Sequence, residues 1–284
     1  MRIITRKLPV NHNLFLFGDD HEGTILRHDE GWEQLCNMME SEYDGCKSNY
    51  GIHHGDPIEA IMTDDPRYDM DTVKEPIPLK QVEAAKKNLN PIKRKVIAMC
   101  EGNHPLKLHR FGALTRAICE PLGVEYGTWS FKLVARDARG SLMYKSFHTH
   151  GRKSITSTAD DVQRRKTNRE LILKRHLKFK MGDVALAAKG HSHQLIVCEP
   201  QSELYMTDDG DVVRKAYTAQ EIDHTAPYIH PDSRFFVNTG SFLRLYGDGV
   251  SGYAEIGEYD PIEIGFAVAK IRDRKIVGVD KVRL

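Results

Sequence analysis

Five short segments of this 284-residue chain combine carboxylates, imidazoles and one carboxamide with neighbouring glycines. In chain order they are Asp19-Asp20-His21, Gly55-Asp56-Pro57-Ile58-Glu59, Gly102-Asn103-His104, His148-Thr149-His150-Gly151 and Gly190-His191-Ser192-His193. A pair spaced as Asp-x-His or His-x-His at a strand end can direct both side chains at one point, and glycine lets the backbone turn sharply beside it. Oxygen and imidazole donors without thiolates suit manganese, iron, zinc or nickel better than a structural zinc site. The segments therefore predict a metal centre.

The residues before these segments have the pattern of short buried strands. Apolar runs predict strands at 13–17, 50–54, 95–100 and 184–188, and a hairpin at 129–135 and 142–148. In open α/β sheets the functional site lies outside the carboxyl ends of the strands. The candidate ligands therefore fall where a site is expected.

Helical spacing and chain breakers predict the remaining elements. We expect helices at 31–42, 79–89, 105–119 and 157–177, the last one starting from a capping box at Ser157. The acidic, proline-bearing stretch 64–78 is expected to be an inserted loop. Further strands are expected at 195–199, 212–218, 234–238, 252–257, 262–270 and 275–283. Early alternation followed by strands predicts an α/β core with an added, mostly antiparallel sheet.

Composition excludes little. Lys and Arg number 41 and Asp and Glu 40, so an argument for nucleic-acid or membrane binding has to be local. The five scattered cysteines form no CxxC pair, which fits a reducing cytoplasm, and we expect a cytoplasmic protein. No stretch approaches the roughly 20 apolar residues of a membrane helix, so we expect no membrane partner.

The five segments, in this order, resemble the calcineurin-like metallophosphoesterase superfamily, whose pattern is D-x-H, GD-x-x-D, GNH, a lone His and GH-x-H. The match spans residues 19–193, and Asn238-Thr239-Gly240-Ser241 resembles a turn that follows the last motif in many bacterial members. The resemblance implies an α/β fold, a four-layer α/β/β/α sandwich of two mixed β-sheets flanked by helices. It also implies a single domain over 1–284, with the strands of 195–284 completing the second sheet.

The resemblance assigns three ligands to each of two divalent ions and one shared carboxylate. These are Asp19, His21 and His193 for the first ion, Asn103, His150 and His191 for the second, and Asp56 as the bridge. His104 would bind no metal and would protonate the departing oxygen. Two ions roughly 3.5–4 Å apart, most simply Mn²⁺, would supply a bridging hydroxide that attacks phosphorus.

Two departures from the family pattern bear on function. The acid of the second motif is Glu59 with no Arg after it, which argues against a protein phosphatase because that Arg grips the substrate phosphate. Pro105 follows His104 where the family has an acid, so Asp20 or Glu101 is expected to orient His104.

The histidines near the motifs leave one choice open. His150 precedes Gly151, as the family's fourth-motif ligand often does, and is favoured over His148. His53 and His54 are expected in the core or behind the ligands.

The stretch 152–180 is strongly basic, with ten Lys or Arg against three acids. It is either a solvated helix face or a surface for a nucleic-acid backbone or polyphosphate. Phe179 is its only aromatic residue, so base stacking is not supported. Arg152 and Lys153, beside His150, are the candidates for direct phosphate contact.

The leading hypothesis is a phosphodiesterase acting on a nucleotide or nucleic acid. The alternatives are a phosphomonoesterase acting on a small phosphorylated molecule, which a deep pocket would favour, and a non-catalytic scaffold on the same fold. Retention of every ligand position argues against the scaffold. Dimers are frequent in the superfamily, but nothing in the sequence fixes an interface.

Overall fold

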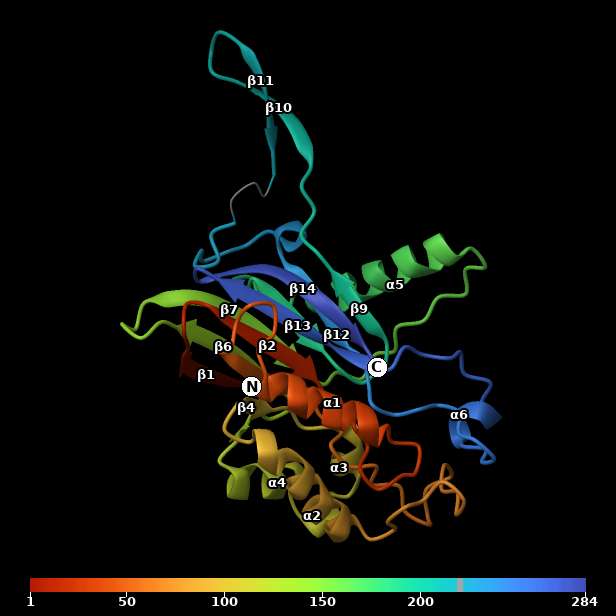
Figure 1. The fold of residues 1–284 in the computed structure, drawn as a ribbon. Helices are drawn as coiled ribbons and strands as arrows, with labels where there is room; N and C mark the ends of the chain where they lie inside the picture. Colours follow the sequence, from red (N-terminus) through yellow and green to blue (C-terminus); the bar gives the residue numbers. More distant parts are fainter. Residues whose placement is uncertain (219–221) are drawn as a thin grey trace.

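The computed structural model describes residues 1–218 and 222–284 and contains two six-stranded sheets that face each other (Figure 1). The predicted four-layer α/β/β/α sandwich of two mixed sheets is confirmed. No helix in these two ranges is both long and apolar enough to span a bilayer. All five cysteines are free thiols.

One sheet carries the first three motifs. Its order is β14 (Lys275–Arg283), β13 (Gly265–Arg272), β2 (His12–Phe17), β3 (Asn49–His53), β4 (Val96–Met99) and β5 (Glu125–Tyr126). Strands β2 to β5 run parallel, and β13 is antiparallel to both β2 and β14. The carboxyl ends of β2, β3 and β4 therefore meet at one edge.

The other sheet carries the last two motifs. Its order is β1 (Arg2–Lys7), β6 (Ser130–Arg136), β7 (Leu142–Thr149), β8 (Leu186–Lys189), β12 (Phe235–Thr239) and β9 (Leu195–Cys198). Strands β7, β8 and β12 are parallel neighbours. From residue 195 on, β9 and β12 lie in this sheet, whereas β13 and β14 lie in the first, so 195–284 does not complete the second sheet alone as expected.

Alternating side chains along the strands produce the four layers. In β2, Leu14 and Leu16 belong to the core between the sheets, whereas Phe15 and Phe17 pack under the helices. All of β2 is buried because both faces of its sheet are covered. The helices on this side are α1 (Asp29–Glu40), α2 (Pro78–Leu89) and α4 (Leu114–Leu122).

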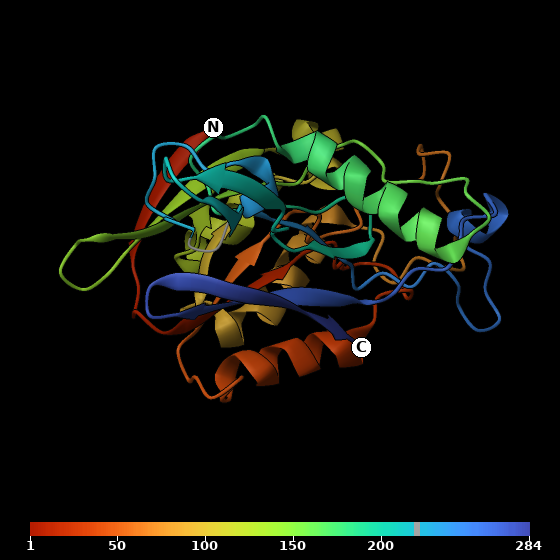
Figure 2. The ribbon, with the colours of Figure 1, turned by 90° about the horizontal axis from the view of Figure 1, so that it is seen from above.

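The opposite face of the molecule is covered by α5 (Val162–Leu177), which lies across the strands from α1 (Figure 2). Only Leu173 and Leu177 of α5 are buried, and they pack on Phe147 and Phe236 of the second sheet. The helix begins at Val162 rather than at the predicted position 157, because Asp161 accepts the backbone N–H of Arg164 and caps it.

Two other predictions about elements are wrong. The expected helix 105–119 is divided into α3 (Asn103–Lys107), the 3₁₀ turn η2 (His109–Phe111) and α4, because Gly112 takes a φ of +99° and turns the chain. The expected strand 252–257 contains the short helix α6 (Tyr253–Ile256), bounded by Gly252 and Gly257. Two 3₁₀ turns, η1 (Asn90–Ile92) and η3 (Pro231–Ser233), complete the helical elements of the described ranges.

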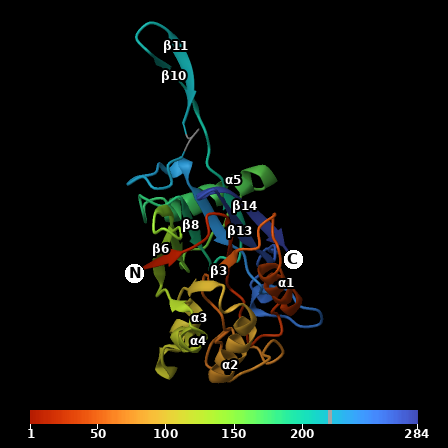
Figure 3. The same ribbon diagram turned by 60° about the vertical axis from the view of Figure 1, so that its left-hand side comes forward.

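Strands β10 (Leu204–Asp208) and β11 (Val213–Tyr217) form a separate hairpin that projects away from the two sheets (Figures 1 and 3). The prediction of a strand at 212–218 is thus correct, but this strand pairs only with β10. The hairpin lies far from the motif loops and does not contribute to the site.

Candidate metal centre

The seven predicted ligands lie in loops that follow five strand ends. Asp19 and His21 follow β2, Asp56 follows β3, Asn103 follows β4, His150 follows β7, and His191 and His193 follow β8. These side chains fall into two groups of closely spaced donor atoms, Asp19 with His21 and His193, and Asp56 with His150 and His191. The first group contains the three residues expected to hold one ion, and the second joins Asp56 to two of the three residues expected to hold the other.

The backbone at these positions is unusual. Five of the seven residues have a positive φ, between +50° and +74°, which non-glycine residues rarely adopt: Asp19, His21, Asp56, His191 and His193. Such conformations each cost about 1–3 kcal/mol and cluster at functional sites. The surrounding loops therefore hold these side chains in directions that an unconstrained chain would not choose.

Glycine permits the close approach of the loops. A Cβ added to Gly102 would collide with the side chain and backbone of Asp56, and one on Gly55 would lie 2.8 Å from Nδ1 of His150. The glycines beside the second and third motifs are required because the loops are in direct contact.

The first group leaves donor atoms without protein partners. Oδ1 of Asp19 is buried, makes no hydrogen bond and lies 3.5 Å from Nε2 of His193. Nε2 of His193 and Nε2 of His21 are 3.2 Å apart. Nδ1 of His21 donates to the Glu59 carboxylate at 2.6 Å, which leaves the Nε2 lone pair for the site.

In the second group, both ring nitrogens of His150 have oxygen atoms as neighbours. Nδ1 of His150 lies 2.7 Å from the carbonyl oxygen of His54, and Nε2 lies 2.7 Å from Oδ1 of Asn103 and 3.2 Å from Oδ2 of Asp56. Both ring nitrogens thus face oxygen acceptors. The ring must carry two protons, or a cation must replace the second proton at Nε2.

The charges of the buried carboxylates explain the pKa values of the neighbouring imidazoles. Burial would lower the pKa of His21, but the charges of Glu59, Asp56 and Asp19 raise it to about 9. Burial would also lower the pKa of His150, but the charge of Asp56 and other nearby groups outweighs burial, so the pKa of His150 is raised. Burial would raise the pKa of Asp19, but the nearby imidazoles of His193 and His150 lower it to about 2. The site therefore has a negative potential that bound cations would relieve.

A turn from the far end of the chain supports both loops. Ser241 donates from Oγ to the carbonyl oxygen of Asp19 at 2.8 Å, and Asn238 accepts from Oγ of Ser192 at 3.0 Å. The predicted Asn238–Ser241 turn thus connects the first motif to the last.

His104 is oriented by a group other than those expected. Asp20 instead pairs with His53 at 2.7 Å, and Glu101 accepts from the hydroxyls of Thr115 and Tyr126. Nδ1 of His104 donates to the carbonyl oxygen of Glu59. The expectation of an orienting carboxylate from Asp20 or Glu101 is therefore wrong, because both are engaged elsewhere.

Arg67 lies against the other side of His104 and was not predicted. Its Nη1 is 3.3 Å from Nε2 of His104, and its guanidinium is held by Asp65 at 2.8 and 3.0 Å. Since Nδ1 of His104 carries the proton, Nε2 accepts from Arg67 and the ring is neutral, in line with a pKa lowered mainly by burial. No motif marks Arg67 in the loop 64–78, so only the fold reveals it.

The other motif histidines lie behind the ligands. His148 is fully buried and contacts Ser146 at 2.8 Å and His54 at 3.1 Å. It is not part of either donor group, so the structure brings His150 rather than His148 to the site. His53 and His54 are also buried, as predicted.

The two donor groups open into a cleft of about 530 Å³. Asp56, Asn103, His104, His191 and His193 line it together with Arg67, Arg169 and Tyr253. Arg152 and Lys153 are exposed and do not line this cleft; Arg152 instead lies over the Trp129 ring, 5.6 Å from its centroid. The Lys or Arg residues that line the cleft are therefore Arg67 and Arg169.

The donor set fits divalent cations on its own chemistry. It offers carboxylate, imidazole and amide donors without thiolate, an orphaned buried carboxylate oxygen at Asp19, and histidines fixed from behind by Glu59 and by a backbone carbonyl. The remaining cluster of His21, Glu59 and His104 is already satisfied by internal hydrogen bonds.

No family model matches this chain, and no curated protein sequence matches it. A solved structure similar to it is a conserved uncharacterized protein of Streptococcus pneumoniae TIGR4, described as a predicted phosphoesterase (12% identity, 96% of this chain and 98% of that one, TM-score 0.32). A second is a metallophosphoesterase from Sphaerobacter thermophilus, with 14% identity over 95% of this chain and 88% of that one and a TM-score of 0.36. A third is the NAD nucleotidase of Haemophilus influenzae, with 12% identity over 98% of this chain and 50% of that one and a TM-score of 0.39.

Proposed function

We propose that this chain is a metal-dependent phosphoesterase of the calcineurin-like metallophosphoesterase superfamily, and that it hydrolyses a phosphodiester of a nucleotide or nucleic acid. The observation that carries the proposal is His150, whose two ring nitrogens both face oxygen acceptors in a buried site. A divalent cation at Nε2 resolves this arrangement. The order of the five motifs supports the same conclusion.

The residues that would hold the cations follow the two donor groups. Asp19, His21 and His193 would hold one ion, and Asn103, His150 and His191 the other, with the Asp56 carboxylate between them. Two bound divalent ions, of which manganese suits these donors, would polarise water and neutralise charge on the phosphoryl group. Glu59 and the His54 carbonyl engage Nδ1 of His21 and His150, so the Nε2 atoms of these rings would be the ones to hold the cations.

His104 and Arg67 would act on the departing oxygen. Both line the cleft, and Nε2 of His104 faces the Arg67 guanidinium. A leaving-group oxygen that enters between them meets a cation on one side and an imidazole nitrogen on the other. Arg67 would neutralise charge that develops on this oxygen. His104, which is neutral at rest, would first take a proton from solvent at Nε2 and then give that proton to the departing oxygen.

The shape of the cleft favours a diester over a small monoester. Thr156 and Ser157 line the cleft and also line a second hollow along α5, so further space adjoins the site on that side. A phosphodiester needs room for a group on each side of phosphorus, whereas a phosphomonoesterase gains from an enclosed pocket. The retained ligand positions speak against a non-catalytic scaffold.

The proposal is tested by comparing hydrolysis of a bis-aryl phosphate with that of the matching aryl phosphomonoester, with manganese added and with a chelator as control. We expect metal-dependent turnover and a preference for the diester. A preference for the monoester would replace the diester assignment with the phosphomonoesterase alternative. Absence of turnover of both substrates, with metal bound, would support the scaffold.

A further inference from the structure

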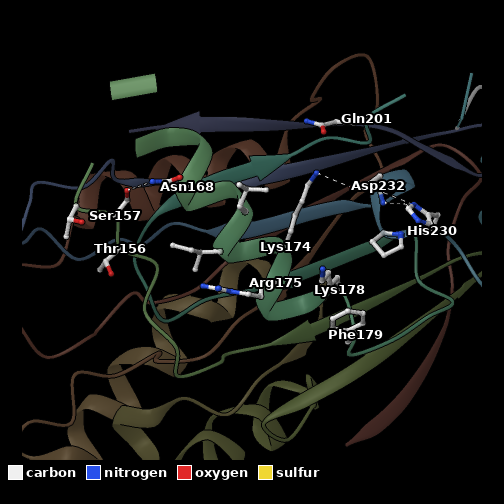
Figure 4. A pocket seen from close by; sticks show the side chains of 14 residues that line it. Thr156, Ser157, Asn168, Lys174, Arg175, Lys178, Phe179, Gln201, His230 and Asp232 are labelled. Carbon is white, nitrogen blue, oxygen red and sulfur yellow. Dashed lines mark hydrogen bonds and ion pairs between the residues drawn. The ribbon is translucent and has the colours of Figure 1, made fainter. Parts of the chain in front are cut away.

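A groove of about 870 Å³ follows one face of α5 (Figure 4). Asn168, Arg175 and Lys178 line it at helical spacing, and Lys174 reaches into it from the same helix. The opposite wall comes from the segments around Gln201 and Asp232. Helix α5 therefore presents a row of cations to a hollow outside the metal centre.

The positive charge of this region is largely uncompensated. Of the ten Lys and Arg residues in 152–180, only Arg169 and Lys174 form ion pairs with acidic side chains of the described residues. Glu170 is the sole acid within α5 and pairs with none of them. A solvated helix face normally balances its charges by i,i+4 pairs, and this helix does not.

The positive charge of this region also affects a neighbouring histidine, His176. The pKa of His176 is lowered to about 4, first by burial and then by the charges of Lys189, Lys153 and other nearby cations. The basic side chains thus act together on this side of the molecule. An anionic ligand would be attracted there.

The groove adjoins the cleft that holds the candidate ligands. Thr156 and Ser157 line both hollows, and Arg169 of α5 lines the cleft that holds the candidate ligands. A ligand that extends from the cleft past Thr156 and Ser157 would reach the groove beside Arg175 and Lys178. A mononucleotide bound in the cleft has no further phosphates to place in the groove, whereas a nucleic-acid strand has.

We propose that this groove holds the phosphodiester backbone of a nucleic-acid strand whose scissile phosphate lies in the cleft. The inference rests on the proposed function, which it narrows to a polymeric substrate. The contacts are made by Lys174, Arg175 and Lys178 to phosphate oxygens, so binding is independent of base sequence. Inorganic polyphosphate carries a similar row of negative charges and is the alternative ligand for these cations.

One acidic side chain opposes such a ligand. Asp232 lies in the groove wall, 3.7 Å from Nζ of Lys174 and 3.6 Å from Nδ1 of His230. It competes with a phosphate for Lys174. Removing its charge therefore strengthens binding if the groove holds an anion, and a merely structural role would not produce a gain.

The test measures the affinity of a fluorescent oligothymidylate by anisotropy, in chelator so that no hydrolysis occurs, over a range of salt concentrations. The variant Lys174→Gln/Arg175→Gln/Lys178→Gln should bind the oligothymidylate on the order of tenfold more weakly or worse. The slope of log affinity against log salt concentration should also become shallower by about 2, because each of the three lost phosphate contacts contributes ~0.7. The matched control Lys80→Gln/Lys87→Gln/Arg94→Gln removes three charges from α2 and the loop after it, on the far layer. It should bind as the wild type does. Asp232→Asn should bind more tightly.

The same variants are then compared in turnover. With manganese, the ratio of kcat/KM for the oligothymidylate to that for the bis-aryl phosphate should fall on the order of tenfold in the α5 variant only. Equal affinities for the α5 variant and its control would overturn the inference while leaving the proposed function intact. Binding of inorganic polyphosphate but not oligothymidylate by the wild type would also overturn it. If the wild type binds through the groove but hydrolyses no diester, the groove stands and the proposed function fails.

Discussion

Arg67 and His104 meet at the edge of the cleft, with Nη1 of the arginine 3.3 Å from Nε2 of the histidine. The carbonyl oxygen of Glu59 fixes the proton on Nδ1, and Asp65 fixes the guanidinium. The two side chains are therefore fixed against each other at the cleft, although Arg67 belongs to an inserted loop and His104 to a motif.

We predict that Arg67→Ala lowers kcat/KM for a phosphodiester on the order of 10²-fold, because it removes a fixed cation from the developing charge. Arg67→Lys should restore only part of the loss, since Asp65 can no longer hold the side chain by two hydrogen bonds. Arg110→Ala is the control, because Arg110 is exposed and pairs with Asp64 at 3.3 Å. Equal activity of Arg67→Ala and Arg110→Ala would show that Arg67 does not contact the substrate.

His104→Ala should keep its metal content and lose turnover by about 10²–10⁴-fold with a poor leaving group. The loss should shrink as the leaving group improves, because a good leaving group departs without proton transfer. Rates for a series of aryl phosphodiesters with different leaving-group pKa values measure this dependence. A loss that is the same across the series would assign His104 a positioning role instead.

Asp56→Asn should lose bound metal and activity together. The carboxylate contacts His150 at 3.2 Å and accepts the backbone N–H of His104 at 2.9 Å, so its charge is central to the second donor group. Metal content by mass spectrometry after dialysis and turnover with added manganese are the two readouts. Asp64→Asn, at an exposed position, is the control. Full metal content in Asp56→Asn would contradict the ligand assignment.

Stability should fall in acid because of His12. This residue is buried between Tyr144 and the carbonyl of Pro9, and burial lowers its pKa to about 4 from 6.5. The unfolded chain binds the proton first as pH falls, so the stability is complete above pH 6.5 and is lost towards pH 4, by roughly 3 kcal/mol.

Urea unfolding at several pH values measures this loss. His12→Gln should flatten the pH dependence between 6.5 and 4, while His109→Gln, at an exposed position, should leave it unchanged. An unchanged slope in His12→Gln would show that other buried histidines account for the whole effect.

The sequence was sufficient for features that depend on short spacing. The five motifs follow strand ends, and parallel β2, β3 and β4 bring three of them to one edge, so a cluster of their side chains could be predicted without coordinates. The division of the ligands between two ions came from the family resemblance. The apolar run at 13–17 likewise predicted the buried strand β2. These features are local in sequence or follow from parallel pairing.

Features that depend on contacts between distant loops could not be predicted. Nothing in the stretch 64–78 distinguishes Arg67 from other exposed arginines, because its role arises from the Asp65 contact and the position of His104. The helix expected at 105–119 is divided at Gly112, since apolar spacing does not show where a glycine will turn the chain. Arg152 and Lys153 are next to a ligand in sequence, but their side chains lie outside the cleft.

The β10–β11 hairpin has a consequence for the dynamics of the chain. Its residues hydrogen-bond only to each other within the described ranges, and Leu204, Met206, Val213 and Tyr217 are exposed on it. An isolated two-stranded hairpin is marginally stable in water. It can therefore open as a local unfolding unit while the sandwich stays folded, and its amide protons should exchange with deuterium much sooner than those of β2.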